Sequence, residues 1–260
     1  MSTELFSCDP KRFARACQAV LHEAQRDSGI GTMGEKSIHA VLKFYFATDT
    51  DTHEQAVGSG VADIVGENGV IEIQSKMFYR LNHKLTQLLP LCPVTVVCPI
   101  IRRKRIHWFS PDTGELIRSG AFRAFQKDEA VFAELYQIRD HLTHPNFRLC
   151  LAVTEAEDYR LADGFGADKR RRATKMDRIP TQLLELRVFE APCDYAVFVP
   201  NGLSQAFTSA EYAKVCHISR TLAQQVLRVL TILQVIQLCG KNGRSNLYSR
   251  SLAFECRNEE

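Results

Sequence analysis

Apolar residues recur along this chain with two periods, and each period predicts one kind of element. A spacing of three and four residues predicts helices over residues 10–25, 34–45, 77–89 and 132–142. Alternating or continuous apolar runs predict strands over residues 55–57, 93–100, 106–109 and 147–153. A further short helix is expected over residues 181–186, after Pro180. Helices interspersed with strands indicate an α/β fold.

Between these elements, the segment from Val61 to Lys76 predicts a β-hairpin. Asn68-Gly69 supplies the two positive-φ residues that a tight type I′ turn needs. On the second strand, Glu72 and Gln74 point to one face and the isoleucines beside them to the other, while Asp63 lies on the first strand. Acids held close together on such a platform attract a hard divalent cation such as Mg²⁺.

A third acid lies on the helix before this hairpin. Ile38, Leu42 and Tyr45 follow helical spacing, and Glu35 falls on the same inward stripe near the start of the helix. An acid on an inward stripe needs a partner, because burying an unpaired charge is unfavourable. A metal ion is one such partner, whereas ordinary solvated strand residues are the alternative for Asp63 and Glu72.

The order of these acids resembles the core signature of the PD-(D/E)xK nuclease superfamily, with Asp63 and Glu72 on adjacent strands and Glu35 on the preceding helix. The resemblance implies a restriction-endonuclease-like, mixed-sheet core with flanking helices. It also implies Mg²⁺ or Mn²⁺ held by Glu35, Asp63 and Glu72, and hydrolysis of phosphodiester bonds, with Asp63 and Glu72 catalytic.

The chain departs from this signature at Gln74, which stands where the superfamily usually has Lys. Gln donates a hydrogen bond and can orient water, but it carries no charge. Lys84 on the following helix, or Lys76 on the same strand face, is expected to supply the missing cation. A catalytically inactive regulator or adaptor on the same fold, which binds DNA without cutting it, remains the alternative.

The C-terminal region predicts a second, smaller domain over residues 191–260, after a nuclease-like domain over residues 1–190. Thr208 to Glu211 is a capping box, and Ser219 can cap a second helix that ends near Leu233. A hairpin with a basic tip follows. This arrangement resembles a winged helix-turn-helix, in which the second helix enters the DNA major groove and the wing contacts the backbone. The residues expected to bind nucleic acid are Arg220, Gln224, Arg228, Lys241 and Arg244.

Charge and composition favour an acidic polymer as partner. The net charge is only +3, but residues 102–105 and 169–172 form basic clusters, each of which is either a phosphate contact or a solvated loop. DNA is favoured over RNA, and the alternative for the C-terminal module is protein contact or a homodimer. No leader or long apolar segment is evident and the nine cysteines are scattered, so a cytoplasmic protein that does not contact membranes is expected.

The segment from Tyr159 to Pro180 resembles one shared by uncharacterised bacterial proteins of the same layout, and no site is assigned to it from the sequence.

Overall fold

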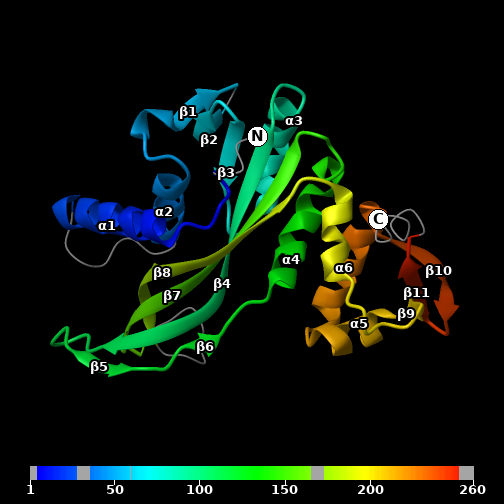
Figure 1. Ribbon diagram of the computed structural model, residues 1–260. Helices are drawn as coiled ribbons and strands as arrows, with labels where there is room; N and C mark the ends of the chain where they lie inside the picture. The colour runs from blue at the N-terminus through cyan, green and yellow to red at the C-terminus, as the bar shows by residue number, and fades with distance from the viewer. Residues whose placement is uncertain (1–4, 28–35, 59, 165–172, 252–260) are drawn as a thin grey trace. The chain divides into compact units, whose positions relative to one another are not determined.

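The computed structural model describes residues 5–27, 36–58, 60–164 and 173–251. Its α-helices are α1 (Pro10–Asp27), α2 (Lys36–Phe46), α3 (Asn82–Leu88), α4 (Phe132–Leu135), α5 (Ser209–Cys216) and α6 (Arg220–Ile232) (Figure 1). Short 3₁₀ turns are η1 (Thr50–Thr52), η2 (Phe78–Leu81), η3 (Asp128–Val131), η4 (Tyr136–His141) and η5 (Pro192–Phe198). The predicted helices over residues 10–25 and 34–45 are therefore confirmed, each within two residues at either end in the described part.

The strands form two sheets. They are β1 (His53–Val57), β2 (Gly60–Gly66), β3 (Gly69–Ile73), β4 (Val94–Phe109), β5 (Leu116–Ser119), β6 (Arg123–Ala124), β7 (Phe147–Leu161), β8 (Thr174–Phe189), β9 (Ala206–Phe207), β10 (Ile236–Asn242) and β11 (Ser245–Arg250). In the described residues, the larger sheet has eight strands in the order β1-β2-β3-β4-β7-β8, with β5 and β6 paired to β4. The smaller sheet has the order β10-β11-β9.

The larger sheet mixes strand directions. Antiparallel hairpins join β1 to β2 and β2 to β3. Val94 donates its N–H to the carbonyl of Asn146, and Ala162 donates to Phe109, so β4 and β7 advance in the same direction. A mixed sheet flanked by helices is the α/β architecture that the sequence predicts.

The chain divides into two compact units. The first comprises Met1–Gln74, Val97–Lys127 and Cys150–Arg187, and the second comprises Ser75–Val96, Asp128–Leu149 and Val188–Glu260. The C-terminal elements expected from residue 191 onward all fall in the second unit, which also takes in two internal segments.

In the first unit, α1 and α2 pack side by side (Figure 1). The inward stripe of α2 is buried as the helical spacing predicts: Ile38, Val41, Leu42 and Tyr45 are all at most 4% exposed. Tyr45 also contacts α1, because its ring lies edge-on to Phe13 and its hydroxyl donates to the carbonyl of Ser7 at 2.7 Å. This packing fixes how α2 presents its remaining side chains.

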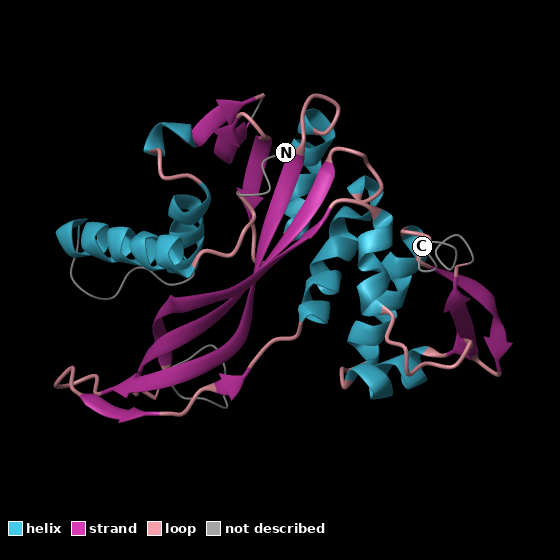
Figure 2. Ribbon diagram, viewed as in Figure 1, coloured by secondary structure: helices cyan, strands magenta, loops and turns pink. Residues whose placement is uncertain are grey.

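In the second unit, helices α5 and α6 pack together, and the small sheet lies beside them (Figure 2). The capping box at Thr208 is confirmed, since Glu211 accepts from the Thr208 N–H at 2.6 Å and donates its own N–H to the Thr208 hydroxyl at 3.3 Å. Ser219 caps α6 as expected, at 3.2 Å from the N–H of Leu222. Along α6, the buried stripe includes Val226, Val229 and Leu230, and Leu222 lies only half-buried.

The turn of the β2–β3 hairpin differs from the prediction. Gly66 pairs with Gly69, so the two loop residues are Glu67 and Asn68 rather than Asn68 and Gly69. Asn68 does not have a positive φ, whereas Gly69 has a φ of +103° at the first position of β3. The predicted type I′ turn is therefore wrong, because the glycine provides its conformational freedom at the start of the strand.

Two other local expectations differ from the structure. The strands predicted over residues 93–100 and 106–109 are parts of one strand, β4, so the solvated-loop alternative for the basic run at residues 102–105 is wrong, and acids on β7 pair with three of its cations. Residues 181–186 are not helical but belong to β8. Their leucines favour helix in isolation, and pairing within a sheet overrides that weak preference. No helix in the described part of the chain is long and apolar enough to cross a membrane.

Candidate functional site

The β2–β3 hairpin places Asp63 and Glu72 next to each other. The last pair of its ladder joins Ile64 to Ile71, and the next residues along the two strands are Asp63 and Glu72. Side chains alternate along a strand, so each acid lies on the face opposite the buried isoleucine that precedes or follows it, and extending the register of the ladder by one residue would bring the two acids together. The Asp63 carboxylate also accepts the backbone N–H of Ile73 at 2.7 Å, which anchors it to β3.

Helix α2 contributes a histidine to this face. His39 Nε2 lies 3.1 Å from Asp63 Oδ2, and the side chains of His39 and Asp63 are 37% and 21% exposed, so solvent reaches the pair. One turn further along α2, Lys43 donates to Glu54 of β1 at 2.7 Å. This hydrogen bond from Lys43, followed by the charge of Lys43, lowers the pKa of Glu54, and the nearby charge of Asp63 opposes the shift. We call His39, Asp63 and Glu72 the acidic cluster.

Glu72 is the most enclosed member of the acidic cluster, at 3% exposed. A carboxylate held so far from water is favourable only with partners that offset its desolvation. Gln74, two residues after Glu72, is half-buried, and its N–H donates to the Val97 carbonyl at 2.9 Å. The strand bearing Glu72 therefore continues along β4, which holds Glu72 and Gln74 on a rigid support.

The remaining predicted site residues are distributed elsewhere. Glu35 lies outside the described residues. Lys76 is exposed, Lys84 is half-buried on α3, and both belong to the second unit. Within the described ranges, no group of three or more His, Cys, Asp or Glu side chains has the arrangement of a metal centre. The carboxylates of Asp63 and Glu72 match Mg²⁺ or Mn²⁺ in ligand type, because these ions take oxygen ligands and keep several waters.

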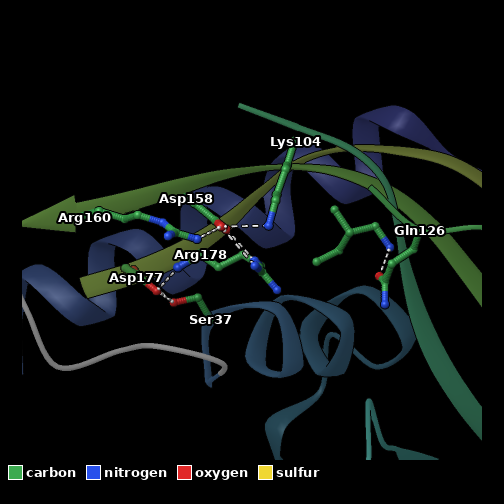
Figure 3. Close-up of polar contacts among 8 residues, drawn as sticks. Ser37, Lys104, Gln126, Asp158, Arg160, Asp177 and Arg178 are labelled. Atoms are coloured by element: carbon green, nitrogen blue, oxygen red, sulfur yellow. Dashed lines mark hydrogen bonds and ion pairs between the residues drawn. The ribbon is translucent and has the colours of Figure 1, made fainter. Parts of the chain in front are cut away.

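A second group of charged side chains crosses strands β4, β7 and β8 (Figure 3). At its centre is Asp158 of β7, which is 0% exposed. Lys104 donates to Asp158 at 3.2 Å, and Arg160 donates at 3.3 Å. Arg178 donates through two nitrogens at 2.5 and 3.0 Å. We call Asp158, Lys104, Arg160 and Arg178 the basic cluster.

The electrostatics of the basic cluster follow from its burial. Desolvation alone would raise the pKa of Asp158, but hydrogen bonds and charge from Arg178, and then from Lys104, hold that pKa well below the usual aspartate range. Desolvation lowers the pKa of Lys104 to about 8, and the attraction of Asp158 opposes the shift only in part. Asp158 is thus fully ionised at neutral pH, while the pKa of Lys104 lies close to neutral pH.

Helix α2 contributes His39 to the acidic cluster and contacts a residue adjacent to the basic cluster. The Ser37 hydroxyl donates to the two oxygens of Asp177 at 3.0 and 3.2 Å, and the next residue on β8 is Arg178 of the basic cluster (Figure 3). Ser37 and His39 are two positions apart, or about 3 Å along the helix axis. One helix therefore links β8 near the basic cluster to the Asp63 strand of the acidic cluster.

Sequence reasoning missed the basic cluster and His39. Lys104 is far from the other members in the sequence, and two of them, Arg160 and Arg178, fall in the segment to which no site was assigned. The signals were the basic run at residues 102–105, which contains Lys104, and the alternation of charged residues along β7, where Asp158 and Arg160 share a face. For His39, the signal was its place on α2, the helix that carries the predicted Glu35 stripe.

All five residues predicted to bind nucleic acid are exposed. Arg220, Gln224 and Arg228 lie on the outer face of α6, and Lys241 and Arg244 lie at the tip of the β10–β11 hairpin. Arg228 also lies over the ring of Tyr136 at 5.7 Å, so its guanidinium is partly engaged within the second unit.

Comparison with known proteins gives a family without an assigned activity. No solved structure matches this chain. An uncharacterized protein of Treponema pallidum (strain Nichols) is 29% identical over 167 residues, which cover 62% of this chain and 63% of that protein. The chain therefore spans less than two thirds of the relative's length. A family model described as a domain of unknown function, DUF8091, matches residues 36–190. That range includes both the acidic and the basic cluster and covers more than half of the chain, so the chain belongs to the DUF8091 family.

Proposed function

We propose that this protein is a metal-dependent nuclease that hydrolyses phosphodiester bonds in DNA. The observation that carries the proposal is the juxtaposition of Asp63 and Glu72 on one face of a rigid hairpin, with His39 bonded to Asp63. Two adjacent acids in a partly enclosed setting repel each other, and a divalent cation relieves that repulsion.

The chain's own residues have separate roles in this proposal. Asp63 and Glu72 would hold Mg²⁺ or Mn²⁺, together with Glu35 as the resemblance to PD-(D/E)xK nucleases implies. His39 and the Ile73 N–H orient the Asp63 carboxylate, as groups behind metal ligands commonly do. The Gln74 amide can donate a hydrogen bond to water or to a phosphate oxygen. When bound, the ion would polarise the phosphate and lower the pKa of a coordinated water.

The C-terminal helices and hairpin support DNA as the substrate. Their order of helix, turn, helix and hairpin is that of a winged helix-turn-helix, and the exposed Arg220, Lys241 and Arg244 suit phosphate contacts. Under this proposal, α6 approaches the major groove and the Lys241–Arg244 hairpin tip contacts the backbone.

A cleavage assay tests the proposal. Purified protein would be incubated with Mg²⁺ or Mn²⁺ and with duplex DNA, single-stranded DNA or RNA. We expect cleavage that Asp63→Asn and Glu72→Gln abolish. Glu67→Gln is the matched control, because Glu67 is an exposed turn residue of the same hairpin and its loss should leave cleavage unchanged.

The outcomes separate the alternatives. If DNA binds but no substrate is cut with either ion, the protein is a DNA-binding regulator or adaptor on a nuclease-like scaffold. That reading is favoured by Gln74, which stands where the resemblance has Lys. If RNA is cut in preference to DNA, the nuclease assignment stands and the substrate changes. Cleavage that persists in both acid variants contradicts the site.

A further inference from the structure

The two faces of β4 and β7 differ in their balance of charge. On one face, Arg103 donates to Glu155, with Nε at 2.7 Å from Oε1, and Arg105 lies 3.7 Å from Glu157. Each arginine there has its own carboxylate. On the other face, Lys104 and Arg160 share Asp158 with Arg178 of β8. Around Asp158, three cations share one acid.

The hydrogen-bond inventory shows the same imbalance. One lysine and two arginines carry about thirteen N–H donors, whereas a carboxylate offers about four lone-pair sites. Asp158 accepts one bond from Lys104, one from Arg160 and two from Arg178, so its acceptor capacity is filled. Within the described ranges, these three side chains donate to no other acceptor. Most of their donors therefore have no acceptor in the described part of the chain.

The N–H donors that Asp158 leaves unused belong to side chains that are largely shielded from water. The side chains of Lys104, Arg160 and Arg178 are 9%, 8% and 14% exposed. The Nε of Arg160 is buried, and it has no hydrogen-bond partner in the described structure. Buried cations in excess of their counter-ions are unfavourable, so an additional anion would stabilise this arrangement.

An aromatic side chain marks where the basic cluster approaches the surface. Lys104 Nζ lies 3.4 Å from the ring centroid of Phe125, and Arg178 lies over the same ring at 5.3 Å. Phe125 is itself 42% exposed. Its ring offsets part of the positive charge but supplies no hydrogen-bond acceptor oxygen. A ligand that enters beside Phe125 would meet ammonium and guanidinium donors together.

We propose that the basic cluster binds a phosphate group, through the N–H donors of Lys104, Arg160 and Arg178 that Asp158 leaves unused. The two planar guanidinium forks and the ammonium suit the tetrahedral oxygens of a phosphate, because arginine binds such oxygens in pairs and lysine acts as a point charge. The phosphate is either free, or on a small molecule, or part of a nucleic-acid backbone. The proposal does not depend on phosphodiester cleavage, since none of these residues belongs to the acidic cluster.

Thermal unfolding of the full-length protein in increasing inorganic phosphate tests the site. Ionic strength would be held constant with chloride, and EDTA would exclude metal-dependent cleavage. We expect the melting temperature of the wild type to rise and saturate, because a ligand that binds only the folded state stabilises it. Arg160→Gln should weaken phosphate affinity about tenfold or more, as expected for lost hydrogen bonds between charged groups.

Two further variants serve as controls. Arg103→Gln removes an arginine from the opposite face of the same strand, and it should keep the wild-type response to phosphate. If Arg160→Gln does not fold, as judged by circular dichroism, Arg160→Lys replaces it. That variant keeps the charge but loses the planar fork, and it should weaken binding several-fold. An equal response to phosphate in wild type and the Arg160 variant, or no saturable response in the wild type, overturns the proposal.

A second arm identifies the source of the phosphate. The affinity for a single-stranded oligonucleotide that lacks a terminal phosphate would be measured at several salt concentrations in the same EDTA buffer. If the bound phosphate belongs to a nucleic-acid strand, Arg160→Gln lowers the slope of log affinity against log salt by about 0.7. If Arg160→Gln affects only inorganic phosphate, the site takes a free phosphate or a small phosphorylated molecule. Both results support the site and assign its ligand.

Discussion

The acidic and the basic cluster lie on strands that contact the same helix, and they have opposite imbalances of charge. In the acidic cluster, Asp63 and Glu72 share a face with His39 as the neighbouring base. In the basic cluster, three cations surround the single carboxylate of Asp158. An excess of acid favours a bound cation, and an excess of base favours a bound anion.

Helix α2 lies beside both clusters. Ser37 and His39 of α2 contact Asp177 and Asp63, on β8 and β2 respectively, so the packing of a single helix orders side chains beside both clusters. If both proposals hold, a protein that acts on nucleic acid would have a cation site and a phosphate site in the same compact unit.

The largest effect is expected from Asp158→Asn. This change leaves three buried cations without their shared carboxylate, and such losses typically destabilise a protein by about 3–5 kcal/mol. Chemical denaturation would measure the difference from wild type. Glu157→Gln, on the opposite face of the same strand and 20% exposed, should cost less than about 1 kcal/mol. Similar losses in the two variants would mean that the two faces do not differ in the way their charge balance suggests.

Added phosphate should destabilise neither variant, and it should raise the melting temperature of Asp158→Asn more than that of wild type.

The next effect concerns the acidic cluster. His39→Ala should lower metal affinity and cleavage by about 10–100-fold, the range typical of residues that orient metal ligands. Calorimetric titration with Mn²⁺ reports the affinity independently of catalysis. His83→Ala is the control, because His83 is an exposed histidine on α3. Unchanged Mn²⁺ affinity in His39→Ala would remove His39 from the cluster's function.

A pH dependence should distinguish the basic cluster from the acidic one. The pKa of Lys104 is lowered to about 8 by desolvation, with Arg160 and Arg178 also lowering it and Asp158 opposing them. Sulfate is the suitable probe, since its charge is constant in this range. Its affinity should be highest below pH 8 and fall as pH rises through 8, because Lys104 loses its proton.

The pH dependence of folding stability has the opposite sign to the pH dependence of sulfate affinity. Between pH 8 and the ordinary lysine value of 10.5, the unfolded chain keeps a proton that the folded state has released. Lys104 therefore makes the ligand-free protein relatively more stable as pH rises through this window. Lys104→Arg should flatten the sulfate profile, and a profile that stays steep in that variant would assign the titration to another group.

The smallest effects are expected at the C-terminal module, which lies outside both clusters. Arg220→Ala and Arg244→Ala should each lower the slope of log affinity against log salt for duplex DNA by about 0.9, as for one lost phosphate contact. Arg228→Ala should change the slope less, because its guanidinium lies over Tyr136. Binding titrations at several salt concentrations measure these slopes. If none of the three changes affinity or slope, the module contacts protein rather than DNA.

Local patterns in the sequence were sufficient for α2 and for the starts of α5 and α6. The stripe of α2, the capping box at Thr208 and the cap at Ser219 depend on residues within a few positions of one another, and the structure has all three. The hairpin that brings Asp63 next to Glu72 was equally local, although its turn is centred one residue earlier than expected.

Only the tertiary structure decided where the charged residues meet. Lys104, Asp158 and Arg178 come from three strands separated by long stretches of chain, and the order of strands in the sheet is a non-local property. The same order explains the two wrong assignments, since pairing with β7 keeps the basic run at residues 102–105 extended and makes residues 181–186 a strand. The sequence alone determined which residues carry charge and where α2, the two capped helices and the β2–β3 hairpin form. Whether a charge is balanced depends on its neighbours in space, and these neighbours exist only once the sheet has assembled.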